Sequence, residues 1–172
     1  MAYTKAQSQA YSAEHVVWSV LDKVAAVEEP FTMTVAGSSM VIPLERRFGT
    51  IENIQAYVDL VCQSVGEGSS APRVRARKSI KAAHYSLGEI AIPTNENQAA
   101  GKSGWAMREI VVLHELAHHF DRRNGHHPAS GGHGPTFVGT FLGLIRGIMG
   151  YETWLLALSS FDQAGVDIDH SV

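Results

Sequence analysis

The pentapeptide His114-Glu115-Leu116-Ala117-His118 restricts the fold and chemistry of this chain more than any other feature of its sequence. On an α-helix, residues four positions apart lie on the same face, so both histidines can direct an imidazole nitrogen at one ion. The glutamate projects beside them, where its carboxylate can accept a proton from a metal-bound water molecule. A shuffled chain of the same composition would contain only about 0.03 such matches. The motif therefore predicts a helix that carries two metal ligands and a general base.

An apolar stripe at helical spacing supports placing the motif on a helix. The stripe consists of Ile110, Leu113, Ala117 and Phe120. The polar residues on the opposite side of the same helix are Arg108, Glu109 and His119. We expect the helix to begin within residues 103–105 and to end at Asn124-Gly125, because glycine commonly follows the last turn of a helix.

A zinc site of this type needs a third protein ligand, since catalytic zinc usually takes three and leaves a fourth position open to water. The candidates that follow the motif are Asp121, His126, His127, His133 and Glu152. Asp121 lies near His118 on the helix and suits a hydrogen bond that orients this histidine better than a bond to the metal. His126 and His127 lie in a loop that must first reverse direction, and Glu152 lies on a later helix. We favour His133, because the helix that opens at Pro135 can aim it at the ion.

Four further helices are predicted from apolar spacing and from capping residues. The first runs from an N-cap at Ser12 to Glu28, and the second from an N-cap at Thr50 to about Val65. A third opens at Pro135, and residues 154–161 form the last. Residues 1–11 and 162–172 are expected to be loose termini.

Residue alternation and turn residues predict two hairpins and one further strand. Residues 31–35 and 40–44 form the first hairpin, residues 82–86 and 89–93 form the second, and residues 73–77 form the strand. Together these elements predict an α+β fold in a single domain, residues 1–172, with a small, mostly antiparallel sheet of hairpins. A strand edge beside the metal would let an extended peptide pair its backbone with the protein.

Composition and charge argue against several classes of protein. With 45% hydrophobic and 18% charged residues and a net charge of -3, the chain has no overall attraction to nucleic acid or to an anionic membrane. The one cysteine, Cys62, cannot form a disulfide within the chain. No secretory signal and no apolar run of transmembrane length occur, so we expect a cytoplasmic protein without a membrane partner.

Two groups of residues near the motif invite a functional interpretation. Arg73, Arg75 and Arg77 share one face of a predicted strand and could meet phosphates, but a solvent-exposed strand face is the favoured interpretation. His84 and Tyr85 lie in the second hairpin, where a role in holding a substrate oxyanion competes with ordinary packing, and we assign them none.

The motif and the residues after it resemble the pattern of SprT-like zinc metalloproteases, in which HExxH is followed by a third histidine that opens the next helix. The matching later residues are His133-Gly134-Pro135-x-Phe137. A wider stretch is similar to a family of HExxH metallohydrolases from actinobacteria and actinobacteriophages. The similar blocks are Arg46-Arg47-Phe48-Gly49, Gln55-Ala56-Tyr57-Val58-Asp59, Arg73-Val74-Arg75-Ala76-Arg77 and Ala83-His84-Tyr85.

This resemblance implies a zincin-like α+β fold, with Zn²⁺ held by His114, His118 and His133 and with Glu115 as the general base. It implies no particular substrate. The metzincin pattern is absent, because Asp121 stands where that pattern has glycine and no histidine follows three residues later. No cysteine-rich zinc ribbon follows the motif, unlike in many SprT-like proteins, so a role directed at nucleic acid has little support.

The sequence therefore predicts a zinc-dependent hydrolase, most simply a metallopeptidase that acts on proteins or peptides. The alternative is a non-catalytic module that uses the metal for its structure and associates with DNA or with a partner protein.

Overall fold

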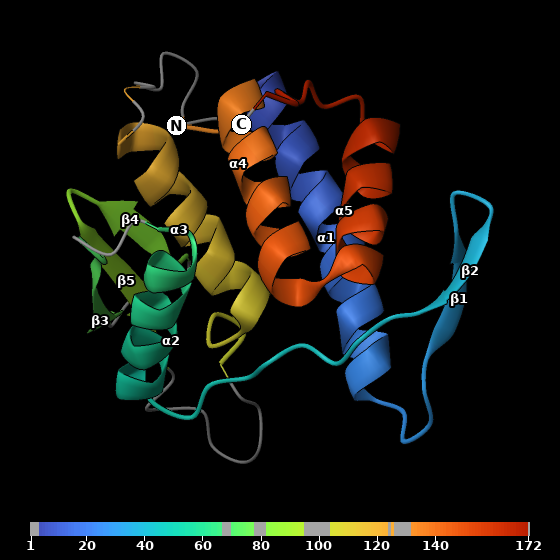
Figure 1. Cartoon of the computed structure of the whole chain (residues 1–172), viewed down its shortest axis with the longest axis horizontal. Coiled ribbons are helices and arrows are strands. Elements are labelled where there is room, and N and C mark those ends of the chain that lie inside the picture. Colours follow the sequence, from blue (N-terminus) through green and yellow to red (C-terminus); the bar gives the residue numbers. More distant parts are fainter. Residues whose placement is uncertain are drawn as a thin grey trace. The chain divides into compact units, whose positions relative to one another are not determined.

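The computed structural model describes residues 4–66, 70–77, 82–94, 104–123, 125 and 132–171 (Figure 1). Within these residues the chain forms five α-helices, one π-helix, a two-stranded sheet and a three-stranded sheet. They belong to two compact units: a helical unit, Met1–Glu45 with Asp121–Val172, and a sheet unit, Arg46–Phe120. The predicted α+β class is confirmed. The zincin-like fold and the single domain over residues 1–172 remain predictions.

Helix α1, Lys5–Ala25, begins well before the expected N-cap at Ser12. Thr4 caps it instead: the Thr4 hydroxyl accepts a hydrogen bond from the Gln7 amide at 3.2 Å, and the Gln7 side chain accepts one from the Thr4 amide at 2.9 Å. This capping box satisfies amide groups at the helix start that would otherwise lack partners. Ser12 lies inside the helix and donates from its hydroxyl to the Ser8 carbonyl at 2.8 Å. The prediction of a loose terminus over residues 1–11 is therefore wrong from Lys5 onward.

Helix α1 packs against α5, Tyr151–Gln163, in the helical unit. The side chains that these two helices bury include Ala10, Ala13, Val17, Leu21, Leu156, Ala157 and Phe161. The segment after α5 was expected to be loose from residue 162, but its backbone is bound to the rest of the unit. The Gln9 side chain donates to the Ala164 carbonyl at 2.8 Å, and the Asp169 amide donates to the Pro135 carbonyl at 3.0 Å.

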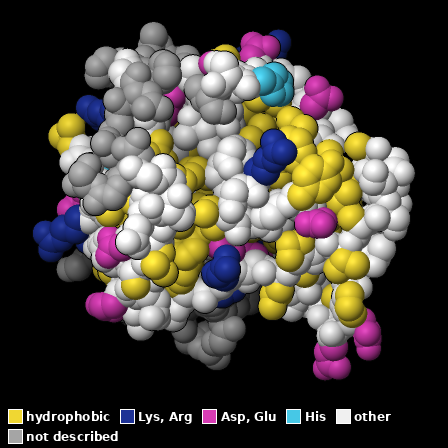
Figure 2. Space-filling view, viewed as in Figure 1, with side chains coloured by type: hydrophobic (Ala, Val, Ile, Leu, Met, Phe, Trp, Pro, Cys, Tyr) yellow, Lys and Arg dark blue, Asp and Glu magenta, His cyan; other side chains and the backbone are white. Residues whose placement is uncertain are grey.

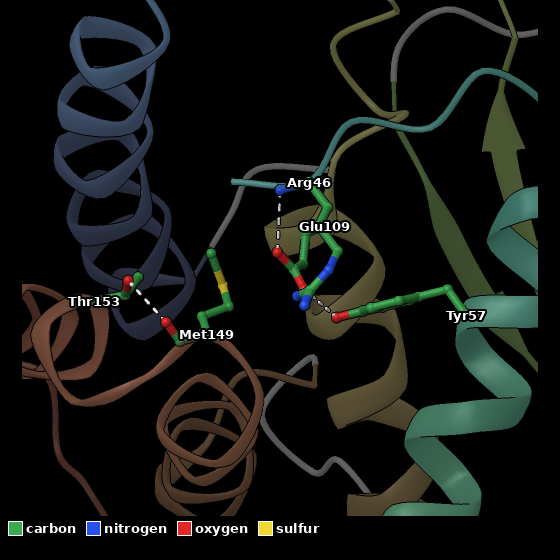
Figure 3. Close-up of polar contacts among 5 residues, drawn as sticks. All are labelled: Arg46, Tyr57, Glu109, Met149 and Thr153. Atoms are coloured by element: carbon green, nitrogen blue, oxygen red, sulfur yellow. Dashed lines mark hydrogen bonds and ion pairs between the residues drawn. The ribbon is translucent and has the colours of Figure 1, made fainter. Parts of the chain in front are cut away.

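Pro135 occupies the first turn of α4, Pro135–Leu144, as predicted. The helix continues as a π-helix, Ile145–Met149, and α5 follows after Gly150. Thr153 joins the two elements, since its buried hydroxyl donates to the Met149 carbonyl at 3.4 Å (Figure 3). The helical nature of residues 154–161 is confirmed, and α5 extends beyond them at both ends.

Both predicted hairpins are present, and each has a two-residue turn. Strands β1, Thr32–Val35, and β2, Ser38–Val41, pair antiparallel around Ala36 and Gly37, with φ of 47° and 80°. Strands β4, His84–Ser86, and β5, Glu89–Pro93, pair antiparallel around Leu87 and Gly88, with φ of 48° and 83°. Positive φ at both turn residues matches the twist of the strands that follow. Because the first turn is this short, β2 begins at Ser38 and not at residue 40.

The three-stranded sheet of the sheet unit has the order β3-β5-β4. Strand β3, Arg73–Arg77, runs parallel to β5, so this sheet is mixed. The β1–β2 and β4–β5 pairs are antiparallel, which agrees with the prediction of mostly antiparallel strands. The central strand β5 is apolar and buried from Ile90 to Pro93, as expected for a strand with neighbours on both sides. Helix α2, Ile51–Ser64, begins at the predicted N-cap Thr50, whose hydroxyl accepts from the Asn53 amide at 3.2 Å.

Helix α3, Glu109–Arg123, carries the motif and begins later than predicted. The residues before it are held in extended pairing with residues 46–48: the Phe48 amide donates to the Met107 carbonyl, and the Glu109 amide donates to the Arg46 carbonyl, each at 3.0 Å. Backbone groups engaged in this pairing cannot form helical hydrogen bonds, so the helix starts only at Glu109. No helix in the described part of the chain has the length and hydropathy needed to cross a membrane.

Candidate metal centre

Helix α3 is buried on more than its apolar side. The predicted stripe of Ile110, Leu113, Ala117 and Phe120 is buried, as expected. The polar residues on the other side are buried as well, with exposures of 3% for Arg108, 2% for Glu109 and 4% for His119. Helix α3 is therefore not a surface helix with one polar side facing the solvent. Its buried polar groups need hydrogen-bond partners from other elements, and these partners hold the motif in place.

Glu109 anchors the first turn of α3 (Figure 3). One carboxylate oxygen accepts hydrogen bonds from Arg46 Nη1 at 2.5 Å and from the Tyr57 hydroxyl at 2.7 Å, and the other accepts from the Arg46 amide at 3.1 Å. The hydrogen bond to Glu109 and the attraction of its charge raise the pKa of Arg46 above its ordinary value. A carboxylate is also favourable at a helix N-terminus, where the backbone dipole is positive. Residue 46 and helix α2 thus hold the start of the motif helix.

His114 and His118 direct their Nε2 atoms at the same point. These atoms lie 3.2 Å apart, and the two rings are inclined at 76° with their centroids 4.9 Å apart. In a tetrahedral zinc site with Zn–N bonds of about 2.05 Å, two nitrogens lie about 3.4 Å apart. The spacing of the two nitrogens therefore fits a shared metal ion, as the motif predicted.

His133 completes a group of three potential ligands. One ring nitrogen from each of His114, His118 and His133 lies within 4.8 Å of the others. His114 and His133 are buried and His118 is half-buried. Three imidazoles are a donor set that suits zinc among other transition metals. The three histidines are close enough to hold a metal ion, and His133 is the third member that the sequence favoured.

The other candidates for the third ligand fall into two classes. Asp121 is buried on α3 and Glu152 is half-buried on α5, and neither belongs to a metal-binding group among the described residues. His126 and His127 lie outside the residues that the structure describes. The predicted base, Glu115, lies on α3 next to His114 in the chain and is 5% exposed. The role of Glu115 as a general base remains a prediction.

Sequence reasoning missed the pairing of His119 with Tyr85. His119 Nδ1 lies 3.1 Å from the Tyr85 hydroxyl, and this hydroxyl also accepts a hydrogen bond from the Gly88 amide at 3.1 Å. The pairing ties α3 to β4 and to the turn that follows it. The sequence feature that could have indicated this pairing is His119 itself. It directly follows the motif, and the helical pattern placed it on the polar side of the helix. His84, the neighbour of Tyr85, is exposed.

The arginine stripe of β3 is partly engaged by its own sheet unit. Arg75 forms an ion pair with Glu89, and Arg77 donates to the Ala82 carbonyl at 3.0 Å. Arg73 and Arg75 are exposed. On the face drawn in Figure 2, Lys and Arg side chains lie scattered, with acidic side chains among them. These contacts agree with the interpretation of the stripe as an exposed strand face.

No protein-family model, curated protein or solved structure matches this chain.

Proposed function

We propose that the protein is a zinc-dependent hydrolase, most simply a peptidase. The observation that carries this proposal is the group of His114, His118 and His133, whose ring nitrogens lie within 4.8 Å of one another, together with the buried Glu115 of the same HExxH motif. Three protein ligands leave a fourth position for water, which is the usual arrangement of a catalytic zinc site and not of a structural one.

In the proposed mechanism the three histidines bind the metal and Glu115 transfers a proton. A zinc ion bound by the three imidazoles would polarise the scissile carbonyl and lower the pKa of a water molecule. The Glu115 carboxylate takes a proton from the attacking water and later delivers it to the leaving nitrogen. The buried position of Glu115 limits competing hydrogen bonds from solvent, and the anchored first turn of α3 keeps the motif helix in place.

A peptide substrate is supported by the position of β4 at the edge of its sheet. An extended peptide can add to such an edge through backbone hydrogen bonds, while pockets along the edge select its side chains. The bond between Tyr85 of β4 and His119 of α3 links this edge strand to the motif helix. Substrate backbone and metal ligands would then be held by connected elements.

The substitution Glu115→Gln tests the mechanism. We expect the variant to retain zinc, because Glu115 is not a ligand, and to lose hydrolysis by about 100- to 10,000-fold, because an amide cannot accept the proton. Metal content is measured by elemental analysis and hydrolysis with a fluorogenic peptide library.

The matched control is Glu152→Gln, which changes a half-buried glutamate outside the histidine group and should keep full activity. Comparable hydrolysis by wild type and Glu115→Gln would refute the assigned base. A wild-type protein that binds zinc and cleaves no member of the library would favour the non-catalytic module.

A further inference from the structure

The ring of His133 contacts two aromatic side chains of the helical unit. Its centroid is 4.9 Å from that of Tyr11, at an interplanar angle of 56°, and 4.7 Å from that of Phe137, at 70°. Both separations fall within the range of favourable aromatic pairs. With an exposure of 5%, His133 has little room to reorient without disturbing these two rings.

One of the two neighbours belongs to the core of the unit. Phe137 of α4 is fully buried, stacks on Phe141 at 6.1 Å, and Phe141 in turn meets Phe161 of α5 at 6.2 Å. Substituting Phe137 would therefore disturb the core as well as His133. Tyr11 is only half-buried and contacts His133 from α1, so its ring can be removed with less damage to the fold.

We propose that Tyr11 is a positioning residue for the third metal ligand, acting through the packing of its ring on His133. The inference rests on the proposed function only in that His133 binds the metal. An imidazole ligand must be held close to its bonding geometry before the ion arrives, and side chains that orient a ligand typically contribute about 10- to 100-fold to metal affinity. Removing the ring of Tyr11 would remove one of these two aromatic contacts of His133 and leave its ring freer to rotate.

The test measures Zn²⁺ affinity by competition with a chromogenic chelator, and the ligand geometry from the visible spectrum of the Co²⁺-substituted protein. Tyr11→Phe retains the ring and should bind zinc within about twofold of wild type. Tyr11→Leu removes the ring and should weaken binding by about tenfold, with altered cobalt bands. Tyr11→Met repeats the measurement with a longer flexible side chain. The matched control is Tyr151→Leu, an aromatic deletion at a residue that is 54% exposed in the same unit.

The substitutions Tyr11→Phe and Tyr11→Leu are then made in a His133→Ala background. If Tyr11 acts through His133, removing its ring has no further effect on the affinity that remains in this background. Equal zinc affinity of wild type and Tyr11→Leu, or an equal loss with and without His133, would overturn the inference. A wild type that binds no zinc would instead refute the proposed function. If the wild type binds zinc without hydrolysing peptides, the peptidase is refuted, and the zinc affinities of the variants still decide the role of Tyr11.

Discussion

At the scale of single residues, the buried Glu109 shows how the sheet unit holds the motif helix. Its carboxylate is 2% exposed and binds both Arg46 and Tyr57. The Arg46 side chain is 60% exposed, so its ion pair contributes at most about 1 kcal/mol after solvent screening. Tyr57 is less exposed, and a hydrogen bond to a charged group contributes about 1.5–3 kcal/mol. The tyrosine is therefore the more important of the two side-chain partners.

The substitution Tyr57→Phe should lower the free energy of unfolding by about 1.5 kcal/mol, because it removes one donor from a buried carboxylate. Urea unfolding followed by circular dichroism gives the value. Tyr151→Phe is the matched control, since Tyr151 is 54% exposed and loses no buried hydrogen bond. Equal destabilisation by the two substitutions would show that the Tyr57 hydroxyl does not support Glu109.

At the scale of elements, the free edge of β3 is covered by one side chain of α2. The Gln55 side chain accepts a hydrogen bond from the Val74 amide at 2.6 Å and donates to the Pro72 carbonyl at 3.2 Å. It thus replaces part of a neighbouring strand, and helix α2 packs against β3. Covering an edge in this way protects it from pairing with other chains.

The substitution Gln55→Leu should destabilise the protein by about 1–3 kcal/mol, since it leaves the buried Val74 amide without an acceptor. Gln55→Glu keeps an acceptor oxygen for the Val74 amide and should destabilise the protein less than Gln55→Leu does. Gln63→Leu, on an exposed position of the same helix, serves as the control in the same unfolding experiment. If leucine and glutamate at position 55 gave the same loss, the hydrogen bond to Val74 would not be the cause.

For the molecule as a whole, each unit has its own buried apolar residues. Zinc binding should add further stability to the folded chain. An ion that binds only the folded state stabilises it by RT ln(1 + [L]/Kd), about 2.7 kcal/mol at a concentration of 100 Kd. For a chain of this length, we expect zinc to raise Tm by about 5–10 °C.

Differential scanning calorimetry with zinc, and again after addition of a chelator, measures this shift. Glu115→Gln should retain it, because the proposed role of Glu115 is that of a base and not of a ligand. His118→Ala should lose most of it. A Tm that does not respond to zinc in the wild type would contradict the metal centre.

Features that depend on neighbouring residues were predictable from the sequence. Histidines four positions apart face one another on a helix whatever the rest of the fold, and their Nε2 atoms lie 3.2 Å apart. Thr50 and Pro135 occupy the helix starts that their types favour. Both hairpins followed from alternating residues around short turns. The start of α1 depends on neighbouring residues as well, because Thr4 and Gln7 form a capping box there.

Features that depend on distant residues could not be predicted from the sequence. The parallel pairing of β3 with β5, the start of α3 at Glu109 and the burial of Arg108, Glu109 and His119 all require partners far along the chain. Residue periodicity specifies which side of an element is apolar, but it does not specify which element covers the other side. Local residue spacing was enough to predict a helix that carries two candidate ligands and a candidate base. In the tertiary structure one ring nitrogen of His133 lies within 4.8 Å of those of His114 and His118, a proximity that residue spacing across a loop does not specify.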